Sequence, residues 1–201
     1  MPGDGRELVE RVAAAVGAGV DWVQIREREL EGAALLAHAE AIALSSKRAA
    51  AECGGEVAIF VNRRTDIALA LDADGVQLGF DAMGATAARQ LLGPDAQIGI
   101  SFHHPDEIRA MDPAADYVQL APVHQPLSKS STRPPLGIAA VTAAARHGVP
   151  VIAQGGISAA HAAAVIDAGA TGVAVTGAIL SAADPISATK SLRAALDAAS
   201  R

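Results

Sequence analysis

Two patterns of apolar residues alternate along this chain of 201 residues. Short runs rich in Val and Ile, with few charges inside them, are typical of strands buried on both faces. Stretches with apolar residues three or four positions apart, often bounded by glycine, are typical of helices. The first pattern predicts strands at residues 20–27, 57–62, 74–79, 97–101, 115–123, 149–153 and 172–175. The second predicts helices at residues 4–17, 32–52, 65–71, 85–92, 105–111, 138–147, 159–168 and 186–199.

The regular alternation of these elements predicts the fold. Right-handed crossovers from strand to helix to strand build a parallel sheet, which closes into a barrel at eight strands. Because eight helices accompany only seven strands, we expect an α/β fold of the (β/α)8 TIM-barrel type whose first strand is missing or atypical. The opening residues MPGDG contain no candidate for that strand. The length suits a single domain over residues 1–201.

Composition narrows the class of protein. Hydrophobic residues make up 51% of the chain and aromatic residues only 2%, which predicts an interior of Ala, Val, Ile and Leu. A net charge of −6 without a basic tract argues against a nucleic-acid partner. Cys53 is the only cysteine, so an internal disulfide is excluded. Without an apolar run of membrane length or a signal-peptide core, we expect a cytoplasmic protein and no membrane partner. The Ala-rich helices favour a homo-oligomer.

Polar residues gather where the predicted strands end, which is where barrels of this kind hold their active sites. Four cations among them, Arg26, Arg28, Arg63 and Lys129, would form a local positive rim suited to a phosphorylated ligand. The alternative is that residues 26–29, with alternating Arg and Glu, are a solvated charge run. The other candidates at these ends are Gln24, Asn62, Gln77, Ser101, His103, His124 and Ser128. His103 and His124 are the candidate acids or bases, whereas His161, on a helix, is expected at the surface.

The last two predicted strands end in glycine. Gly155 and Gly156 follow one strand, and Thr176 and Gly177 follow the other. In barrels these loops often bind phosphate through backbone N–H groups, which glycine leaves accessible. The alternative is that the glycines only make tight turns.

Taken in register, these residues resemble the thiamine phosphate synthase/TenI superfamily of (β/α)8 barrels. Nine segments carry the resemblance in the family's order: VQIRER, VNRRTDIAL, DGVQLG, IGISFH, ADYVQLAPV, SK, PPLG, QGGI and GATGVAVTGAI. The synthase couples hydroxymethylpyrimidine pyrophosphate to thiazole phosphate with Mg²⁺. Its pattern implies pyrimidine and pyrophosphate binding by Gln24, Arg26, Arg28, Asn62, Ser101, Ser128 and Lys129. It implies thiazole-phosphate binding by Gly155, Gly156, Thr176 and Gly177.

The chain departs from the synthase pattern at the metal site. Where synthases place acidic ligands, this sequence has Arg63 and Ala82, with Asp81 one residue early. A hard cation needs anionic oxygen, so no metal or cofactor is expected, with Mg²⁺ required only by a synthase. The TenI branch also lacks these acids and includes metal-independent thiazole tautomerases. Their catalytic His, in a GHVF motif, falls on Pro122, and His124 would face the same side two residues later.

Three functional readings follow from this resemblance. The favoured one is a TenI-like thiazole tautomerase, an isomerase that binds a phosphorylated thiazole without metal. The first alternative is thiamine phosphate synthase, a transferase. The second is a non-catalytic regulatory relative that binds thiazole phosphate or thiamine phosphate without turnover.

Overall fold

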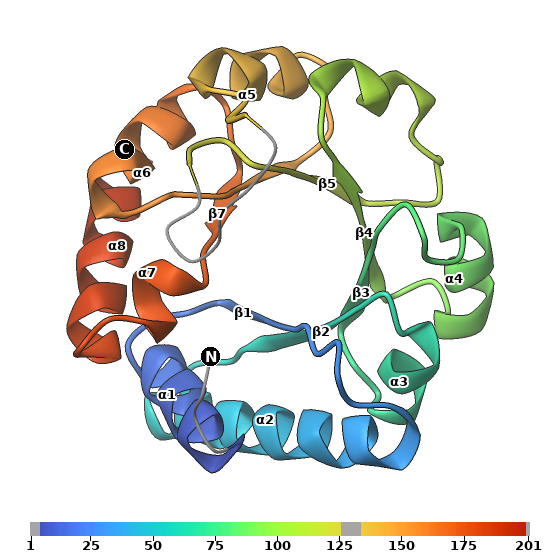
Figure 1. The fold of residues 1–201 in the computed structure, drawn as a ribbon, viewed down its shortest axis with the longest axis vertical. Helices are drawn as coiled ribbons and strands as arrows, with labels where there is room; N and C mark the ends of the chain where they lie inside the picture. The colour runs from blue at the N-terminus through green and yellow to red at the C-terminus, as the bar shows by residue number, and fades with distance from the viewer. Residues whose placement is uncertain (1–4, 126–133, 200–201) are drawn as a thin grey trace.

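A computed structural model of the chain describes residues 5–125 and 134–199. Its centre is a curved sheet of parallel strands hydrogen-bonded in chain order from β1 to β7, seen end-on in Figure 1. Val, Ile and Leu dominate these strands because helices cover the outer face of the sheet. The strands are β1 (Trp22–Ile25), β2 (Ala58–Asn62), β3 (Gly75–Leu78), β4 (Gln97–Phe102), β5 (Tyr117–Leu120), β6 (Val151–Gln154) and β7 (Gly172–Ala174).

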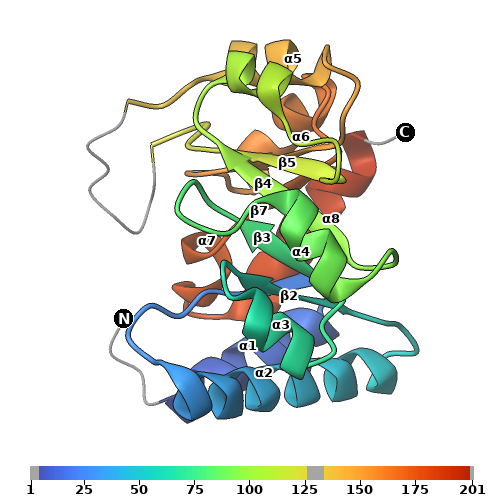
Figure 2. The ribbon, with the colours of Figure 1, turned by 90° about the vertical axis from the view of Figure 1, so that its right-hand side faces the viewer.

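Helices surround the outer face of the sheet (Figures 1 and 2). Two of them, α2 and α4, begin and end at the predicted residues, and the element predicted at 105–111 is a 3-10 helix. No helix in the described part of the chain combines the length and apolar character needed to cross a membrane. The helices are α1 (Gly5–Gly17), α2 (Gly32–Glu52), α3 (Thr65–Ala70), α4 (Ala85–Leu92), η1 (Pro105–Ala110), α5 (Ile138–Ala145), α6 (Ala159–Asp167), α7 (Gly177–Leu180) and α8 (Pro185–Ala199).

The sheet is a barrel with one strand position open. Among the described residues β1 and β7 are its edges, and no strand pairs them. Helices bridge this position instead: the Arg11 guanidinium of α1 donates to the carbonyl oxygens of Leu180 and Ala182, next to α7. The prediction of a TIM-type α/β fold without its first strand is therefore confirmed, and a closed eight-stranded barrel is not formed.

Carboxylates fix the register of the strands at their amino ends. Asp74, just before β3, accepts from the Ile59 amide at 2.7 Å. Asp116, just before β5, accepts from the Ile98 amide at 2.6 Å and from the Arg89 guanidinium at 2.7 Å. Each carboxylate thus satisfies a backbone donor of a neighbouring strand that would otherwise be partly buried and unpaired. These acids are structural and lie at the end of the barrel opposite the candidate site.

Three aromatic side chains pack together on the inward face of the sheet, toward the amino ends of the strands. Trp22 stacks on Phe60 with ring centroids 4.5 Å apart, and Tyr117 meets Trp22 edge-on at 5.3 Å. A Cβ on Gly75 would lie 2.6 Å from the Phe60 ring, and one on Gly99 would lie 2.2 Å from the Tyr117 ring. The prediction of an aliphatic interior is confirmed for the three core clusters, whose buried residues are all Ala, Val, Ile or Leu, but the buried Phe60 and Tyr117 are exceptions to it. The three rings, called here the aromatic layer, fit because neighbouring strands carry glycine beside them.

Candidate functional site

The carboxyl ends of the strands form the rim of the barrel, called here the barrel mouth, and polar side chains lie just inside it. They stand two residues beyond the aromatic rings and the glycines beside them, on the same inward face. Gln24 Nε2 donates to Gln119 Oε1 at 3.3 Å, and Gln77 Nε2 donates to Ser101 Oγ at 3.0 Å. Gln77 Oε1 is buried and accepts no hydrogen bond from a described residue. This polar layer, which consists of Gln24, Asn62, Gln77, Ser101 and Gln119, therefore contains one buried acceptor that no described residue satisfies.

Gln119 is the member of this layer that the sequence reasoning missed. Its side chain is 3% exposed and receives the hydrogen bond from Gln24 on a strand four places away in the sheet. The signal was present, because a Val-Gln pair followed by Ile or Leu recurs in β1, β3 and β5. Three strands with Gln at equivalent positions predict three amides at one level of the barrel.

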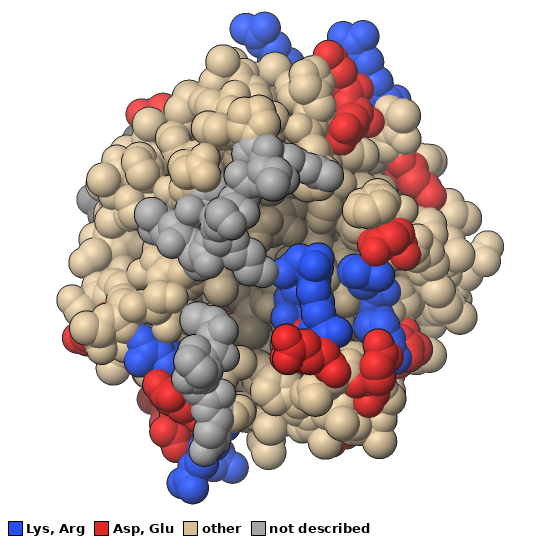
Figure 3. Space-filling model, in the orientation of Figure 1, with Lys and Arg blue, Asp and Glu red and all other residues tan. Residues whose placement is uncertain are grey.

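Three arginines lie together at the mouth. Arg26 and Arg28 follow β1, and Arg63 follows the neighbouring strand β2. Burial lowers the pKa of Arg26, and the charges of Arg28 and Arg63 lower it further, so the guanidinium groups are near enough to repel one another. Figure 3 shows Lys and Arg side chains gathered beside the central hollow on this face of the molecule. We call these three residues the arginine cluster.

Most carboxylates beside the cluster are engaged elsewhere. Glu27 Oε1 accepts from the Glu29 and Arg28 amides at 2.8 Å and 2.5 Å, and these hydrogen bonds lower the pKa of Glu27. Neither Arg26 nor Arg28 forms a salt bridge with a described residue. Arg26, Arg28 and Glu29 are exposed, so the alternative of a solvated charge run stays open.

Arg63 is the one member of the cluster with an acidic partner among the described residues. Its Nη2 lies 2.8 Å from Asp81 Oδ2, and both side chains are about two-fifths exposed, at 39% and 41%. The described residues contain no group of three or more His, Cys, Asp or Glu placed to hold a metal ion. A guanidinium has only donors and carries a positive charge, so Arg63 cannot ligate a cation. The donor set at this position therefore does not fit Mg²⁺.

His103 lies at the mouth beyond β4. Its Nδ1 is 2.7 Å from the carbonyl oxygen of Ala121, and its backbone amide donates to Glu107 at 2.9 Å. Since a carbonyl oxygen can only accept, Nδ1 carries the proton and the neutral ring presents Nε2 as a base. His104 has a structural role: its ring accepts from the Asp106 amide at the start of η1.

His124 packs against the helix after β6. Its ring stacks on that of His161 with centroids 4.3 Å apart, and Ser158 Oγ lies 3.3 Å from His161 Nδ1. Burial lowers the pKa of His124, and the charge of His161 lowers it further. The Nε2 atom of His124 is buried without a hydrogen-bond partner in the described chain. His161, expected at the surface, is half-buried and stacks on His124.

The glycines after β6 have a packing role. Gly155 and Gly156 have φ values of 98° and 62°, which favour glycine. A Cβ on Gly155 would lie 2.7 Å from Pro122, and one on Gly156 would lie 2.2 Å from the Gln125 carbonyl oxygen. After β7, Thr176 precedes Gly177 at the start of α7 without capping it through its side chain. Phosphate binding at these turns stays a prediction, since packing alone already requires Gly155 and Gly156.

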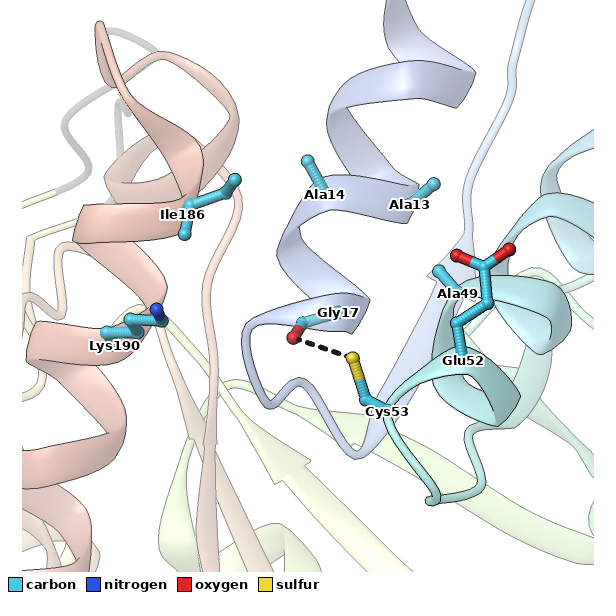
Figure 4. A pocket seen from close by; sticks show the side chains of 8 residues that line it. All are labelled: Ala13, Ala14, Gly17, Ala49, Glu52, Cys53, Ile186 and Lys190. Carbon is cyan, nitrogen blue, oxygen red and sulfur yellow. Dashed lines mark hydrogen bonds between the residues drawn. The ribbon is translucent and has the colours of Figure 1, made fainter.

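Ser128 and Lys129, the remaining predicted ligands, lie outside the described residues. The larger of the two cavities described, about 430 Å³, also lies away from the mouth. Figure 4 shows it among α1, α2 and α8, where Cys53 donates to the Gly17 carbonyl at 3.4 Å. It contains none of the predicted site residues. The candidate site is therefore the mouth, where the arginine cluster, the buried amides and His103 gather.

Comparison with known proteins identifies the family. The thiamine monophosphate synthase family matches residues 2–179. The chain is 37% identical over 196 residues to a thiamine-phosphate synthase of Roseiflexus sp., covering 96% of this chain and 80% of that protein. It is 39% identical over 202 residues to the thiamine-phosphate synthase of Haloquadratum walsbyi, covering 98% of this chain and 87% of that protein.

A solved structure agrees with these sequences. Thiamine phosphate pyrophosphorylase from Pyrococcus furiosus is 28% identical, with a TM-score of 0.80, covering 95% of this chain and 90% of that one. The similarity thus extends over the strands that carry the arginine cluster, the polar layer and the glycine turns. The chain belongs to the thiamine monophosphate synthase family.

Proposed function

We propose that this chain is a thiamine phosphate synthase, a transferase that joins hydroxymethylpyrimidine pyrophosphate to thiazole phosphate. The two sequence relatives reported above are named thiamine-phosphate synthase and the solved structure thiamine phosphate pyrophosphorylase, which favours this reading over the tautomerase that the sequence placed first. Both belong to thiamine biosynthesis and act on phosphorylated small molecules.

The observation that supports the proposal is that the arginine cluster and the glycine turns, two predicted anion sites, lie at one mouth. The arginine cluster lies over the ends of β1 and β2, and the glycine turns lie at the ends of β6 and β7. A coupling enzyme needs both, because each of its substrates carries a phosphate group. A tautomerase acts on one phosphorylated thiazole and would leave the cluster without a ligand.

The polar layer lies between these two regions, where the reacting rings would meet. Its amides can donate to and accept from an aminopyrimidine, and the buried Gln77 Oε1 is an acceptor still free for that purpose. In the reaction, the bond between the methylene carbon and the diphosphate oxygen breaks, and its electron pair leaves with the diphosphate. The lone pair of the thiazole nitrogen forms the new carbon–nitrogen bond. No proton, oxidant or reductant is consumed, and the enzyme's task is to orient two rings and stabilise the leaving charge.

The test is a coupling assay with purified protein and both substrates. We expect thiamine phosphate and pyrophosphate to form in equal amounts, and Gln77→Leu to slow the reaction because it removes the free acceptor. Gln90→Leu, on the exposed face of α4, is the matched control. Binding of both substrates without any product would contradict the proposal and favour the regulatory relative.

A thiazole tautomerase is the second candidate, and the geometry of His103 favours it. With Nδ1 bonded to the Ala121 carbonyl, the ring exposes Nε2 as a base at the mouth. Aromatisation of thiazole carboxylate phosphate by the protein, lost in His103→Gln, would support this reading. The same assay with both substrates present separates it from the synthase.

A further inference from the structure

The arginine cluster contains guanidinium groups without a carboxylate partner. Among the described residues its three arginines have one such partner, Asp81, which pairs with Arg63. Glu27 and Glu29, on the same segment as Arg26 and Arg28, form no salt bridge with them, and the Glu27 carboxylate accepts from the backbone. A fourth nearby arginine, Arg64, pairs with Asp66 and Glu31, each 2.7 Å away. The guanidinium groups left without a carboxylate partner here are therefore those of Arg26 and Arg28.

Guanidinium groups suit a particular ligand. Each presents a planar fork of N–H donors that matches two oxygens of a phosphate, and Arg keeps its charge when partly buried. A diphosphate has oxygens on two phosphorus atoms, so several forks can bind it at once. A divalent metal neutralises the same group through carboxylate ligands, which this chain lacks at Arg63 and Ala82.

We propose that Arg26, Arg28 and Arg63 bind the diphosphate of the pyrimidine substrate directly and take the place of the divalent cation. The inference rests on the proposed synthase function. Asp81 holds Arg63 at the mouth in the free protein, and the diphosphate replaces Asp81 as the partner of this guanidinium. When the carbon–oxygen bond breaks, the cluster stabilises the negative charge that passes to the diphosphate.

The decisive measurement is calorimetric titration with inorganic pyrophosphate, which reports on the site independently of turnover. We expect the protein to bind pyrophosphate in the presence of a chelator at least as tightly as in excess Mg²⁺, because the metal lowers the charge of the ligand. Binding that requires Mg²⁺ would overturn the inference.

Three substitutions assign the binding to the cluster. Arg63→Asn should weaken pyrophosphate binding by about 10- to 100-fold, the usual effect of losing charge-assisted hydrogen bonds. Asn is chosen because Arg63 has a φ of 65°, a conformation that Asn adopts more readily than most residues. Asp81→Asn should bind as tightly as the unchanged protein or a few-fold more tightly, since it removes the competing carboxylate. Arg64→Gln, the matched control, should bind unchanged. Weaker pyrophosphate binding by Asp81→Asn would contradict the replacement of Asp81 by the diphosphate as the partner of Arg63. This outcome would count even if Arg63→Asn failed to fold.

A reciprocal variant sharpens the result. Arg63→Asp combined with Ala82→Asp supplies two carboxylates at the mouth, so its pyrophosphate binding should become dependent on Mg²⁺. Coupling assays run beside the titrations separate the two proposals. Metal-free binding without coupling would retain the inference and refute the synthase function, whereas coupling that requires Mg²⁺ would retain the function and refute the inference.

Discussion

The two halves of the barrel mouth differ in the chemistry they present. The half over β1 and β2 carries three guanidinium groups at adjacent strand ends. The described turns of the other half, residues 121–125, 154–158 and 175–177, contain no Lys, Arg, Asp or Glu. They present glycine backbone, hydroxyl groups and the stacked pair of His124 and His161. The first half can bind an anion through side-chain charge, and the described turns of the second only through short-range hydrogen bonds and dipoles.

The two halves should therefore respond differently to substitution. Side-chain cations can be removed without disturbing the backbone, so substitutions in the arginine cluster should alter binding and leave stability nearly unchanged. The glycine half depends on close backbone approach, so a single added carbon there should alter stability first.

The largest effect should come from Gly156→Ala. The new Cβ would lie 2.2 Å from the Gln125 carbonyl oxygen, at a φ of 62° that disfavours any side chain. Clash and strain together should cost roughly 3 kcal/mol or more of the free energy of unfolding. Chemical denaturation of the variant and the unchanged protein measures this loss.

Gly148→Ala is the matched control for that measurement. Gly148 has a similar φ of 75°, but a Cβ there would meet nothing within 4 Å. Its cost should be only the strain of the backbone conformation, about 1 kcal/mol. Equal losses in the two variants would show that the approach of the loop after β5 to Gly156 is not what requires glycine.

Next in size should be the effect of Arg26→Ala on coupling. Arg26 is exposed at the mouth and feels the charges of both other members of the cluster, so we expect it to contact the leaving group. We expect the coupling rate to fall about 30-fold, equivalent to about 2 kcal/mol, with the free energy of unfolding little changed. Arg109→Ala, on η1 away from the mouth, should retain the full rate. An unchanged rate in Arg26→Ala would mean that the cluster does not touch the substrate.

The sequence predicted the framework of the barrel well because its signals are local. Apolar residues three or four apart, ended by glycine, placed α2 at residues 32–52 and α4 at residues 85–92, as observed. The arginine cluster could also be predicted from the sequence, because the carboxyl ends of consecutive parallel strands lie at one rim. What was missed depends on contacts between distant segments. The stacking of His124 on His161 and the bond from Gln24 to Gln119 join turns and strands that no local pattern relates.

The aromatic layer is a second feature that the sequence did not predict, because its rings come from distant segments of the chain. A composition of 2% aromatic residues predicted an aliphatic interior, yet the rings of Phe60 and Tyr117 are buried and pack against Trp22, which is 43% exposed. An average over the chain cannot show where a few large rings lie. The positional signal was the glycine at Gly75 and Gly99, each two residues before a polar residue of the mouth.

Added salt should weaken anion binding more at the arginine cluster than at the glycine turns, and this effect should be smaller than those of the substitutions above. Mobile ions screen exposed guanidinium groups more than they screen short-range hydrogen bonds from backbone amides. Between about 0.05 M and about 0.5 M salt, pyrophosphate affinity should fall about tenfold and thiazole-phosphate affinity about threefold. Calorimetric titrations at several salt concentrations give both slopes. Equal slopes would mean that side-chain charge also binds the thiazole phosphate, so the two halves would not differ in how they bind anions.

The smallest effect should be a pH dependence confined to the glycine half. Burial and the charge of His161 lower the pKa of His124 below its ordinary value, so below about pH 6.5 the unfolded chain binds a proton that the folded chain does not. The free energy of unfolding should therefore decrease as the pH falls below this value, and only by a fraction of a kcal/mol, because the half-buried ring keeps part of its hydration. Carboxylates with lowered pKa values, such as Asp66, lose their contribution only at more acidic pH, which separates the two effects. Denaturation curves at several pH values should show the decrease in the unchanged protein and not in His124→Phe, whose ring can still stack on His161. The same decrease in both proteins would assign it to another group and leave the His pair with a packing role only.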